Sequence, residues 1–443
     1  MKLATSARAA AVTVGLAAGL AACGGTTGTL AVDLVTAPDS HVLDAVQRLR
    51  LTLTEPHQVV EAVRGAAGFD VALELDATSA AGALIVEGFD AGGALVACGQ
   101  SPRLPLGGIN ASVAVYVAAP RSIALAPAAL SGALSGVAGV AVSFGAVLAG
   151  GAGEPGAAAA TTAIAAYSAF DHTLSPGVPL PAPRAGLAIG ATTASSVYLF
   201  GGSDAAGAPT GTLWRFDATA APMGSMNPIS DQASFARAGQ GLVPIASDHY
   251  LVTGAPVLDL QIGTMTARTD VASLPAAGTE VVPGDGNPTA IFAGPGLLRY
   301  RGGQFDALGG DAGANLGPGA ATVLLPDGRI AVFGGSPGPD ALVVDGATGA
   351  VTAVTGALSV ARQFPAAAAT SRYVVVAGGS DATGAPIATA DVLDAQTLAR
   401  VATLPIRGQI GGFALALPDD QVLIGGGAPA AAALELFTPE PPP

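Results

Sequence analysis

Short apolar runs, each closed by glycine, recur along the C-terminal two thirds of the chain. After a polar gap, each run is followed by a second apolar run that ends at Asp. The copies are AVLAGG at 146–151, VYLFGG at 197–202, YLVTGA at 250–255, AIFAGPG at 290–296, IAVFGG at 330–335, VVVAGG at 374–379 and VLIGGG at 422–427. Their first glycines are 40 to 53 residues apart. A recurrence of this kind indicates a repeat architecture.

The apolar run that ends at Asp is a second mark with the same spacing. It occurs at Phe170-Asp171, Phe216-Asp217, Leu258-Asp259, Phe305-Asp306, Val344-Asp345 and Leu393-Asp394, and Phe437-Thr438 ends the series. A repeat near 45 residues accommodates four short strands, which is the size of one β-propeller blade. Seven copies predict seven blades. Six blades stay possible, because the third and fourth copies lack a glycine doublet.

The residue types inside the repeat support strands. The run before each glycine is apolar and often β-branched or aromatic, which is typical of an inner strand buried between neighbouring blades. Glycine then permits a positive φ or a close approach of two backbones where the chain turns. Polar turn sequences follow, and those at 203–211 and 380–388 are near copies of each other.

The repeat resembles that of Kelch-repeat propellers. The clearest copy contains Arg184, Gly201-Gly202, Trp214 and Phe216-Asp217, and a second contains Arg362, Gly378-Gly379 and Leu393-Asp394. The resemblance covers roughly residues 137–440 and is weakest in the third and fourth copies. It implies an all-β protein with a Kelch-type β-propeller at residues 121–440, followed by a short tail at 441–443.

Closing such a ring requires one more strand. The last repeat supplies three apolar runs before the chain reaches Pro441–Pro443. The segment SIALAPAA at Ser122–Ala129 precedes the first repeat and is apolar enough to form the missing strand. We therefore expect Ser122–Ala129 to pair with the last repeat.

Residues 30–120 form a separate region with strand-like runs. These are Leu30–Val35, Leu49–Leu53, Val71–Leu75, Ala83–Val86, Ala94–Cys98 and Val113–Val117. Gly92-Gly93 between two of them indicates a hairpin turn. Several short strands in about 90 residues are typical of a small β-sandwich. The region is expected to act as a spacer; a sugar- or protein-binding module is the alternative.

The N-terminal sequence indicates export and lipid attachment. Lys2 and Arg8 precede the apolar stretch Ala9–Ala22, and Leu20-Ala21-Ala22-Cys23 resembles a bacterial lipobox. The resemblance implies a signal peptide at 1–22, a lipidated tether at 23–29 that carries palmitate on Cys23, and anchoring in the bacterial cell envelope. Because Gly24 rather than Asp follows the cysteine, the outer membrane or cell surface is favoured. An ordinary signal peptide is the alternative.

Charge and hydropathy exclude some partners. The formal net charge is −14 and Lys2 is the only lysine, so the surface is expected to repel nucleic acid. The uncharged stretch at 122–153 is the best candidate for a transmembrane helix. Its glycines and Pro127 argue against one.

The residues give little support for catalysis. The histidines at positions 41, 57, 172 and 249 lack metal-ligand spacing, so no metal or other cofactor is expected. Cys98 is expected to be a buried small apolar residue. Asp419-Asp420 is expected in a solvated hairpin turn. A propeller hydrolase, lyase or oxidase that acts on sugars at the channel mouth stays the alternative, since such sites are assembled from distant loops.

Four arginines recur in register with the glycines. Arg184, Arg237, Arg362 and Arg407 precede the first glycine of their repeats by 16 to 18 residues. Equivalent positions in a closed ring lie on one face, so these guanidinium groups are a candidate site for an anionic ligand. The alternative is structural, with each arginine bound to loop carbonyls or to a repeated Asp. The function expected from the sequence is that of a monomeric, lipid-anchored binding or scaffold protein for a protein or glycan ligand.

Overall fold

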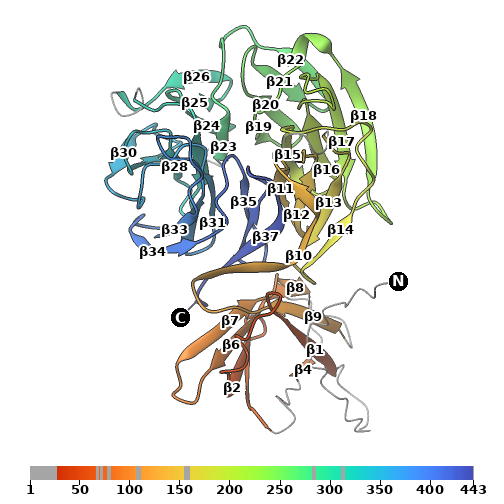
Figure 1. The fold of residues 1–443 in the computed structure, drawn as a ribbon, viewed down its shortest axis with the longest axis vertical. Helices are drawn as coiled ribbons and strands as arrows, with labels where there is room; N and C mark the ends of the chain where they lie inside the picture. Colours follow the sequence, from red (N-terminus) through yellow and green to blue (C-terminus); the bar gives the residue numbers. More distant parts are fainter. Residues whose placement is uncertain are drawn as a thin grey trace.

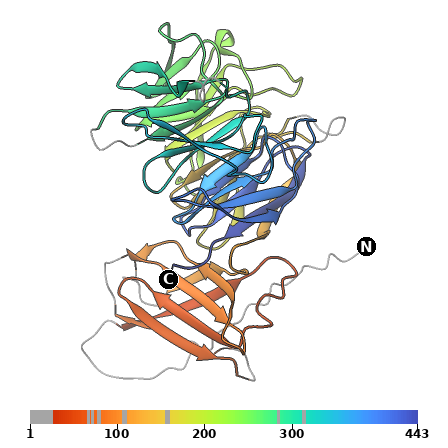
Figure 2. The same cartoon turned by 90° about the vertical axis from the view of Figure 1, so that its left-hand side faces the viewer.

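The computed structural model describes residues 27–65, 69, 73–76, 81–105, 111–153, 160–281, 286–310 and 315–442. The expected signal peptide and Cys23 lie outside these residues. The described chain is all-β, as the sequence predicts, with a 3₁₀ turn η1 at Ala233–Phe235. Its strands fall into an N-terminal pair of sheets and a large ring of sheets, which lie one above the other in Figures 1 and 2.

The N-terminal part consists of two main sheets and a two-stranded ladder. One sheet has the order β3-β2-β6-β7, another has the order β4-β1-β9, and β5 pairs with β8. The bounds are β1 Thr27–Val35, β2 Arg48–Leu53, β3 Gln58–Val63, β4 Leu73–Asp76, β5 Ala81–Gly82, β6 Leu84–Phe89, β7 Leu95–Gln100, β8 Leu104–Pro105 and β9 Ala111–Tyr116. One apolar cluster contains Leu30 and Val113 from one sheet and Leu51 and Val86 from the other, so the two sheets share a core.

The expected hairpin in this region is confirmed. Strands β6 and β7 pair antiparallel, and Gly93 in their turn has a φ of 84°. The Asp90 carboxylate accepts hydrogen bonds from the backbone N–H groups of Gly92 and Ala94. Strand β3 was not expected, because Glu61 interrupts its apolar residues and half of the strand is exposed.

Between Ser122 and Thr438, the described strands form seven four-stranded antiparallel sheets. In each sheet the strands run in order from the innermost to the outermost. The first three sheets contain β11 Ala138–Val142, β12 Gly145–Ala149, β13 Ile164–Ser168 and β14 Thr173–Pro176; β15 Ala188–Thr193, β16 Ser196–Phe200, β17 Thr212–Asp217 and β18 Ser225–Asp231; and β19 Leu242–Ala246, β20 His249–Val252, β21 Leu258–Gln261 and β22 Thr264–Ala267. The next three contain β23 Ala277–Val281, β24 Thr289–Ala293, β25 Leu297–Arg301 and β26 Gln304–Ala307; β27 Ala320–Leu324, β28 Ile330–Gly334, β29 Ala341–Val344 and β30 Val351–Val354; and β31 Ala366–Ala369, β32 Tyr373–Ala377, β33 Thr389–Asp394 and β34 Arg400–Pro405. The closing sheet contains β35 Phe413–Ala416, β36 Val422–Gly425, β37 Ala431–Thr438 and β10 Ser122–Leu134.

The first strands of successive sheets contact one another in a closed circuit. Strand β11 contacts β15, the contacts continue through β19, β23, β27, β31 and β35, and β35 contacts β11 again. This propeller-like arrangement surrounds a common axis in Figure 1. The apolar run before each glycine belongs to the second strand from this axis. That strand is fully buried in every sheet except at His249, the first residue of β20. A strand packed on both faces needs a continuous apolar sequence, which explains the recurring run.

The expected closing strand is confirmed and is longer than the sequence suggested. Ser122 lies opposite Thr438 and Leu125 opposite Glu435, so β10 is the outer strand of the last sheet. Its pairing is interrupted by register shifts before it ends at Leu134. Residues 122–153 therefore contain three strands in place of a transmembrane helix. In the part of the chain that the structure describes, no helix is long and apolar enough to cross a membrane.

The glycines join one sheet to the next. The N–H of Gly151 donates to the carbonyl of Arg184 at 2.9 Å, and the N–H of Gly202 donates to the carbonyl of Arg237 at 2.8 Å. In both cases the acceptor directly precedes the next sheet. A β-carbon on Gly150 would lie 2.5 Å from the Arg184 carbonyl oxygen, so a larger residue does not fit there. The bond also exists where the doublet is lost, as from Gly254 to Leu274.

The repeated Asp caps the turn between the third and fourth strands in four sheets. The carboxylates of Asp171, Asp217, Asp345 and Asp394 each accept bonds from backbone N–H groups two or three residues later. Asp306 differs, because it lies on the fourth strand β26 and forms an ion pair with Arg299 at 3.0 Å. Asp259 also differs, because it lies inside the third strand β21 and pairs with His249 and Arg268. The expectation that Leu258-Asp259 and Phe305-Asp306 are equivalent to the other marks is therefore wrong.

We predict that ring closure depends on β10. Deleting residues 122–130 removes the partner of β37 and exposes that strand, and it is expected to lower the melting temperature by at least about 5 °C. Thermal unfolding followed by circular dichroism measures the effect. Leu125→Ala shortens an exposed side chain of the same strand and is the control, with an expected change below about 2 °C. An unchanged melting temperature in the deletion would contradict a stabilising role for this pairing.

Candidate functional site

Arg184 is tied into its own sheet. Its side chain is buried, and its guanidinium donates to the Thr212 hydroxyl on β17 and to the Pro183 carbonyl. The guanidinium carbon also lies 4.9 Å from the centre of the Trp214 ring. Burial lowers the pKa of Arg184, although the group stays charged at neutral pH. These contacts connect the segment before β15 to the third strand of the same sheet.

Arg237 and Arg362 repeat this arrangement. Arg237 donates to the carbonyls of Thr253 and Pro256, which lie in the connection between β20 and β21. Arg362 is 1% exposed, donates to the carbonyls of Gly378 and Thr389, and forms a 2.8 Å ion pair with Asp391. Both side chains of that ion pair are fully buried. The guanidinium groups therefore face protein atoms within their sheets.

Arg407 differs from the other three. Its side chain is exposed, and its backbone N–H donates to the carboxylate of Glu435 at 3.1 Å. The nearby Arg407 charge helps to lower the pKa of Glu435, but burial outweighs it and raises that pKa. The structure thus does not bring the four guanidinium groups into one cluster, and the contacts of Arg184, Arg237 and Arg362 favour the structural alternative. A ligand role for the four arginines stays a prediction.

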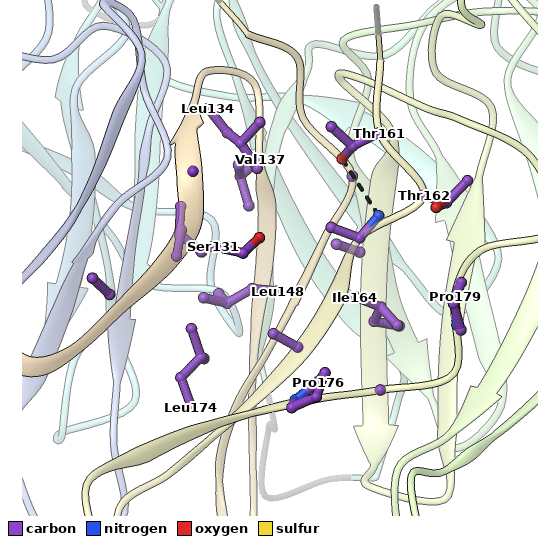
Figure 3. A pocket seen from close by; sticks show the side chains of 18 residues that line it. Ser131, Leu134, Val137, Leu148, Thr161, Thr162, Ile164, Leu174, Pro176 and Pro179 are labelled. Atoms are coloured by element: carbon purple, nitrogen blue, oxygen red, sulfur yellow. Dashed lines mark hydrogen bonds between the residues drawn. The ribbon is translucent and has the colours of Figure 1, made fainter. Parts of the chain in front are cut away.

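An uncharged cleft opens at the seam where the ring closes. It has a volume of about 590 Å³ and lies between β10 of the closing sheet and β13–β14 of the first sheet. Leu134 and Val137 approach it from one side, and Ile164, Pro176 and Pro179 from the other (Figure 3). Apolar atoms dominate its lining. The sequence did not reveal this cleft, because its two walls come from strands that belong to different sheets.

A buried polar cluster joins the N-terminal sheets to the ring. The backbone N–H of Tyr116, at the end of β9, donates to Nε2 of His172 at 3.1 Å. Nδ1 of His172 lies 3.1 Å from the Tyr167 hydroxyl. Because Nε2 is the acceptor, the proton of the neutral ring is on Nδ1. His172 therefore fixes the last residue of β9 against the turn after β13.

Asp419 lies beside this histidine and is also buried. Its Oδ2 atom is 3.9 Å from His172 Nε2, which is too far for a hydrogen bond, and this oxygen has no hydrogen-bond partner. Burial lowers the pKa of His172 to about 4 and raises the pKa of Asp419 to about 8. Both groups are therefore neutral at pH 7. The expected turn at Asp419-Asp420 is present between β35 and β36, but the expectation that Asp419 is solvated is wrong.

Cys98 belongs to the same junction. Its thiol is buried, as expected, and donates to the Pro439 carbonyl at 3.3 Å. Burial raises the pKa of the thiol to about 12, so it stays protonated at neutral pH and is a poor nucleophile. Among the described residues, no group of three or more His, Cys, Asp or Glu side chains is arranged to hold a metal ion.

Comparisons with known proteins add no family. No protein-family model matches the chain, and no curated protein matches it.

We predict that Arg362 is required for stability. Replacing it in Arg362→Met leaves the buried carboxylate of Asp391 without its counter-ion, which is expected to cost about 3–5 kcal/mol of unfolding free energy. Arg407→Met removes an exposed charge at the equivalent repeat position and is expected to cost less than about 0.5 kcal/mol. Urea unfolding of both variants measures the difference. Equal, small losses would contradict the structural role.

We predict that stability falls as the pH rises from 6.5 to 8. In this range Asp419 is ionised in the unfolded chain but largely protonated in the folded protein, whose pKa is about 8. His172 acts in the opposite direction only between about pH 4 and 6.5, where the unfolded chain alone is protonated. The slope contributed by Asp419 is at most about 1.4 kcal/mol per pH unit.

Asp419→Asn removes the ionisable group and is expected to flatten the pH dependence between 6.5 and 8. Asp39→Asn changes an exposed aspartate of the N-terminal region and is the control, which should keep the wild-type slope. Urea midpoints at several pH values measure both. A wild-type slope in Asp419→Asn would show that other groups cause the pH dependence.

Proposed function

We propose that this protein is a lipid-anchored, extracytoplasmic binding protein of the bacterial cell envelope, at the outer membrane or cell surface. In this proposal, residues 122–438 form a seven-bladed Kelch-type propeller that binds a protein or glycan, and residues 27–117 form a β-sandwich spacer. Seven four-stranded sheets with a closed circuit of inner strands support the blade number. The shared core of the two N-terminal sheets supports the sandwich.

The observation that carries the proposal is the position of the N-terminal strand relative to the ring. Strand β1 runs nine residues from Thr27 to Val35, and the Val35 carbonyl accepts from Val117 beside the ring. A strand of this length spans about 30 Å, which separates Thr27 from the Val35–Val117 contact beside the ring. A lipid on Cys23, only a few residues before Thr27, would place the membrane near Thr27.

The ring is attached by one end of its sheets. Its contacts with the N-terminal part include His172 in the turn after β13 and Gln421 after the turn that follows β35. In antiparallel four-stranded sheets, these turns lie at the end opposite the glycine loops and the connections to the next sheet. The glycine-loop end therefore lies opposite the end that contacts the N-terminal part. This orientation suits a protein that presents a binding face to its surroundings.

We predict that Cys23 carries the lipid. Cells that express the full chain and receive labelled palmitate should label the wild-type protein and the Cys98→Ser variant, but not Cys23→Ser. Cys98 is the matched control because its thiol is buried and protonated. Label on Cys23→Ser would contradict lipid attachment at this residue.

Binding is tested separately from anchoring. Purified full-length protein in detergent is applied to a glycan array and to native envelope proteins, and its metal content and its turnover of sugar substrates are measured. A saturable ligand without turnover supports the binding function. Turnover would favour the enzyme alternative.

A further inference from the structure

One end of the ring is formed by short connections that precede the first strand of each sheet. Their backbones bond to one another from sheet to sheet. Gly186 donates to the Gly136 carbonyl at 3.0 Å, and Gly239 donates to the Gly186 carbonyl at 2.8 Å. The same chain of bonds recurs later, from Phe364 to Gly319 at 2.7 Å and from Gly411 to Phe364 at 3.2 Å. We call these six residues the mouth positions.

Phe364 is the exception among the mouth positions. All six have a positive φ: 62° at Gly136, 59° at Gly186, 69° at Gly239, 81° at Gly319, 52° at Phe364 and 63° at Gly411. Five are glycine, which adopts this left-handed region without steric cost. A bulky aromatic residue there is strained by its β-carbon. Phe364 therefore occupies a position at which the backbone geometry favours glycine.

The Phe364 side chain does not recover this cost through burial. It is 46% exposed, and one side of its ring lies against Gly319. Its backbone is held on both sides by the mouth hydrogen bonds, and Arg362, two residues earlier, is locked in the sheet by its ion pair with Asp391. The surrounding structure thus forces the strained conformation and leaves an aromatic face open. Residues held in this way are concentrated at functional sites.

The chemistry around Phe364 selects a class of ligand. Its neighbours among the mouth positions are glycines, and the guanidinium groups of Arg184 and Arg362 are buried in their sheets. Arg407 is exposed in the connection to Gly411, but its charge is offset by Glu435, whose carboxylate accepts from the Arg407 N–H. A bond along the mouth uses one of the two lone pairs of its acceptor carbonyl. An aromatic face beside such acceptors matches the apolar face and the hydroxyl groups of a sugar ring.

We infer that Phe364 is the stacking platform of a site for neutral saccharides at the mouth of the ring. The inference rests on the proposed binding function and specifies both the end of the ring that binds and the class of ligand. The pyranose ring stacks on the exposed face of Phe364, and its hydroxyl groups donate to mouth carbonyls. The aromatic side chain is retained against its conformational cost because the ligand uses it.

The test separates binding from stability. Full-length protein is titrated with neutral oligosaccharides that bind on the array, and Phe364→Gly, Phe364→Trp and Val401→Ala are compared. Phe364→Gly removes the platform and relieves the strain, so we expect at least about a tenfold weaker affinity with a melting temperature no lower than that of the wild type. Phe364→Trp keeps an aromatic face and should bind. Val401→Ala trims a comparably exposed side chain on β34 and should change neither quantity.

Several results would overturn the inference. Unchanged affinity in Phe364→Gly, or a large loss of its thermal stability, would show that the aromatic ring is not retained for binding. Binding of acidic saccharides alone would contradict a site for neutral saccharides and would indicate Arg407 as the binding residue. Saturable binding of a protein that is independent of Phe364, with no neutral glycan bound, would overturn the saccharide site and leave the proposed binding function intact.

Discussion

The ring depends on one backbone interaction that is repeated from sheet to sheet. A glycine N–H after the second strand donates to the carbonyl of the residue that introduces the next sheet, as from Gly151 to Arg184 and from Gly379 to Gln409. The bond requires a left-handed backbone and a close approach, and a β-carbon would prevent both. At the seam the direction is reversed, and Val137 donates to the Gly426 carbonyl. The recurrence of glycine in this sequence is the direct result of this contact.

The arginines contribute to the same contacts between neighbouring sheets. The Arg362 carbonyl accepts from Gly335 of the preceding sheet, while its guanidinium binds carbonyls and Asp391 in its own sheet. One residue thus couples two neighbouring sheets. This double role explains why arginine recurs in a chain with few basic residues and why three of the four candidate guanidinium groups face protein atoms.

The two ends of the ring have different chemistry. At one end, His172 and Asp419 are buried and neutral, and His172 accepts the hydrogen bond from the last residue of β9. At the other end, successive backbones bond around the mouth and Phe364 stays exposed in a conformation suited to glycine. The attached end is stabilised by burial, whereas the open end keeps a strained residue. The proposed binding site therefore lies at the end of the sheets opposite the end that contacts the N-terminal part.

The sequence by itself determined the all-β class, the repeat and the closing strand, because buried second strands and glycine turns impose local patterns that one repeat after another displays. The sequence also contains a phenylalanine in place of glycine at position 364. Arg362-Gln363-Phe364 corresponds to Arg184-Ala185-Gly186 and Arg237-Ala238-Gly239 in other repeats. Only the tertiary structure decided that the arginines point into their sheets, that Asp419 is buried and that Asp306 lies on a fourth strand. These properties depend on contacts between residues far apart in the chain, such as Tyr116 and His172, and no local pattern encodes such contacts.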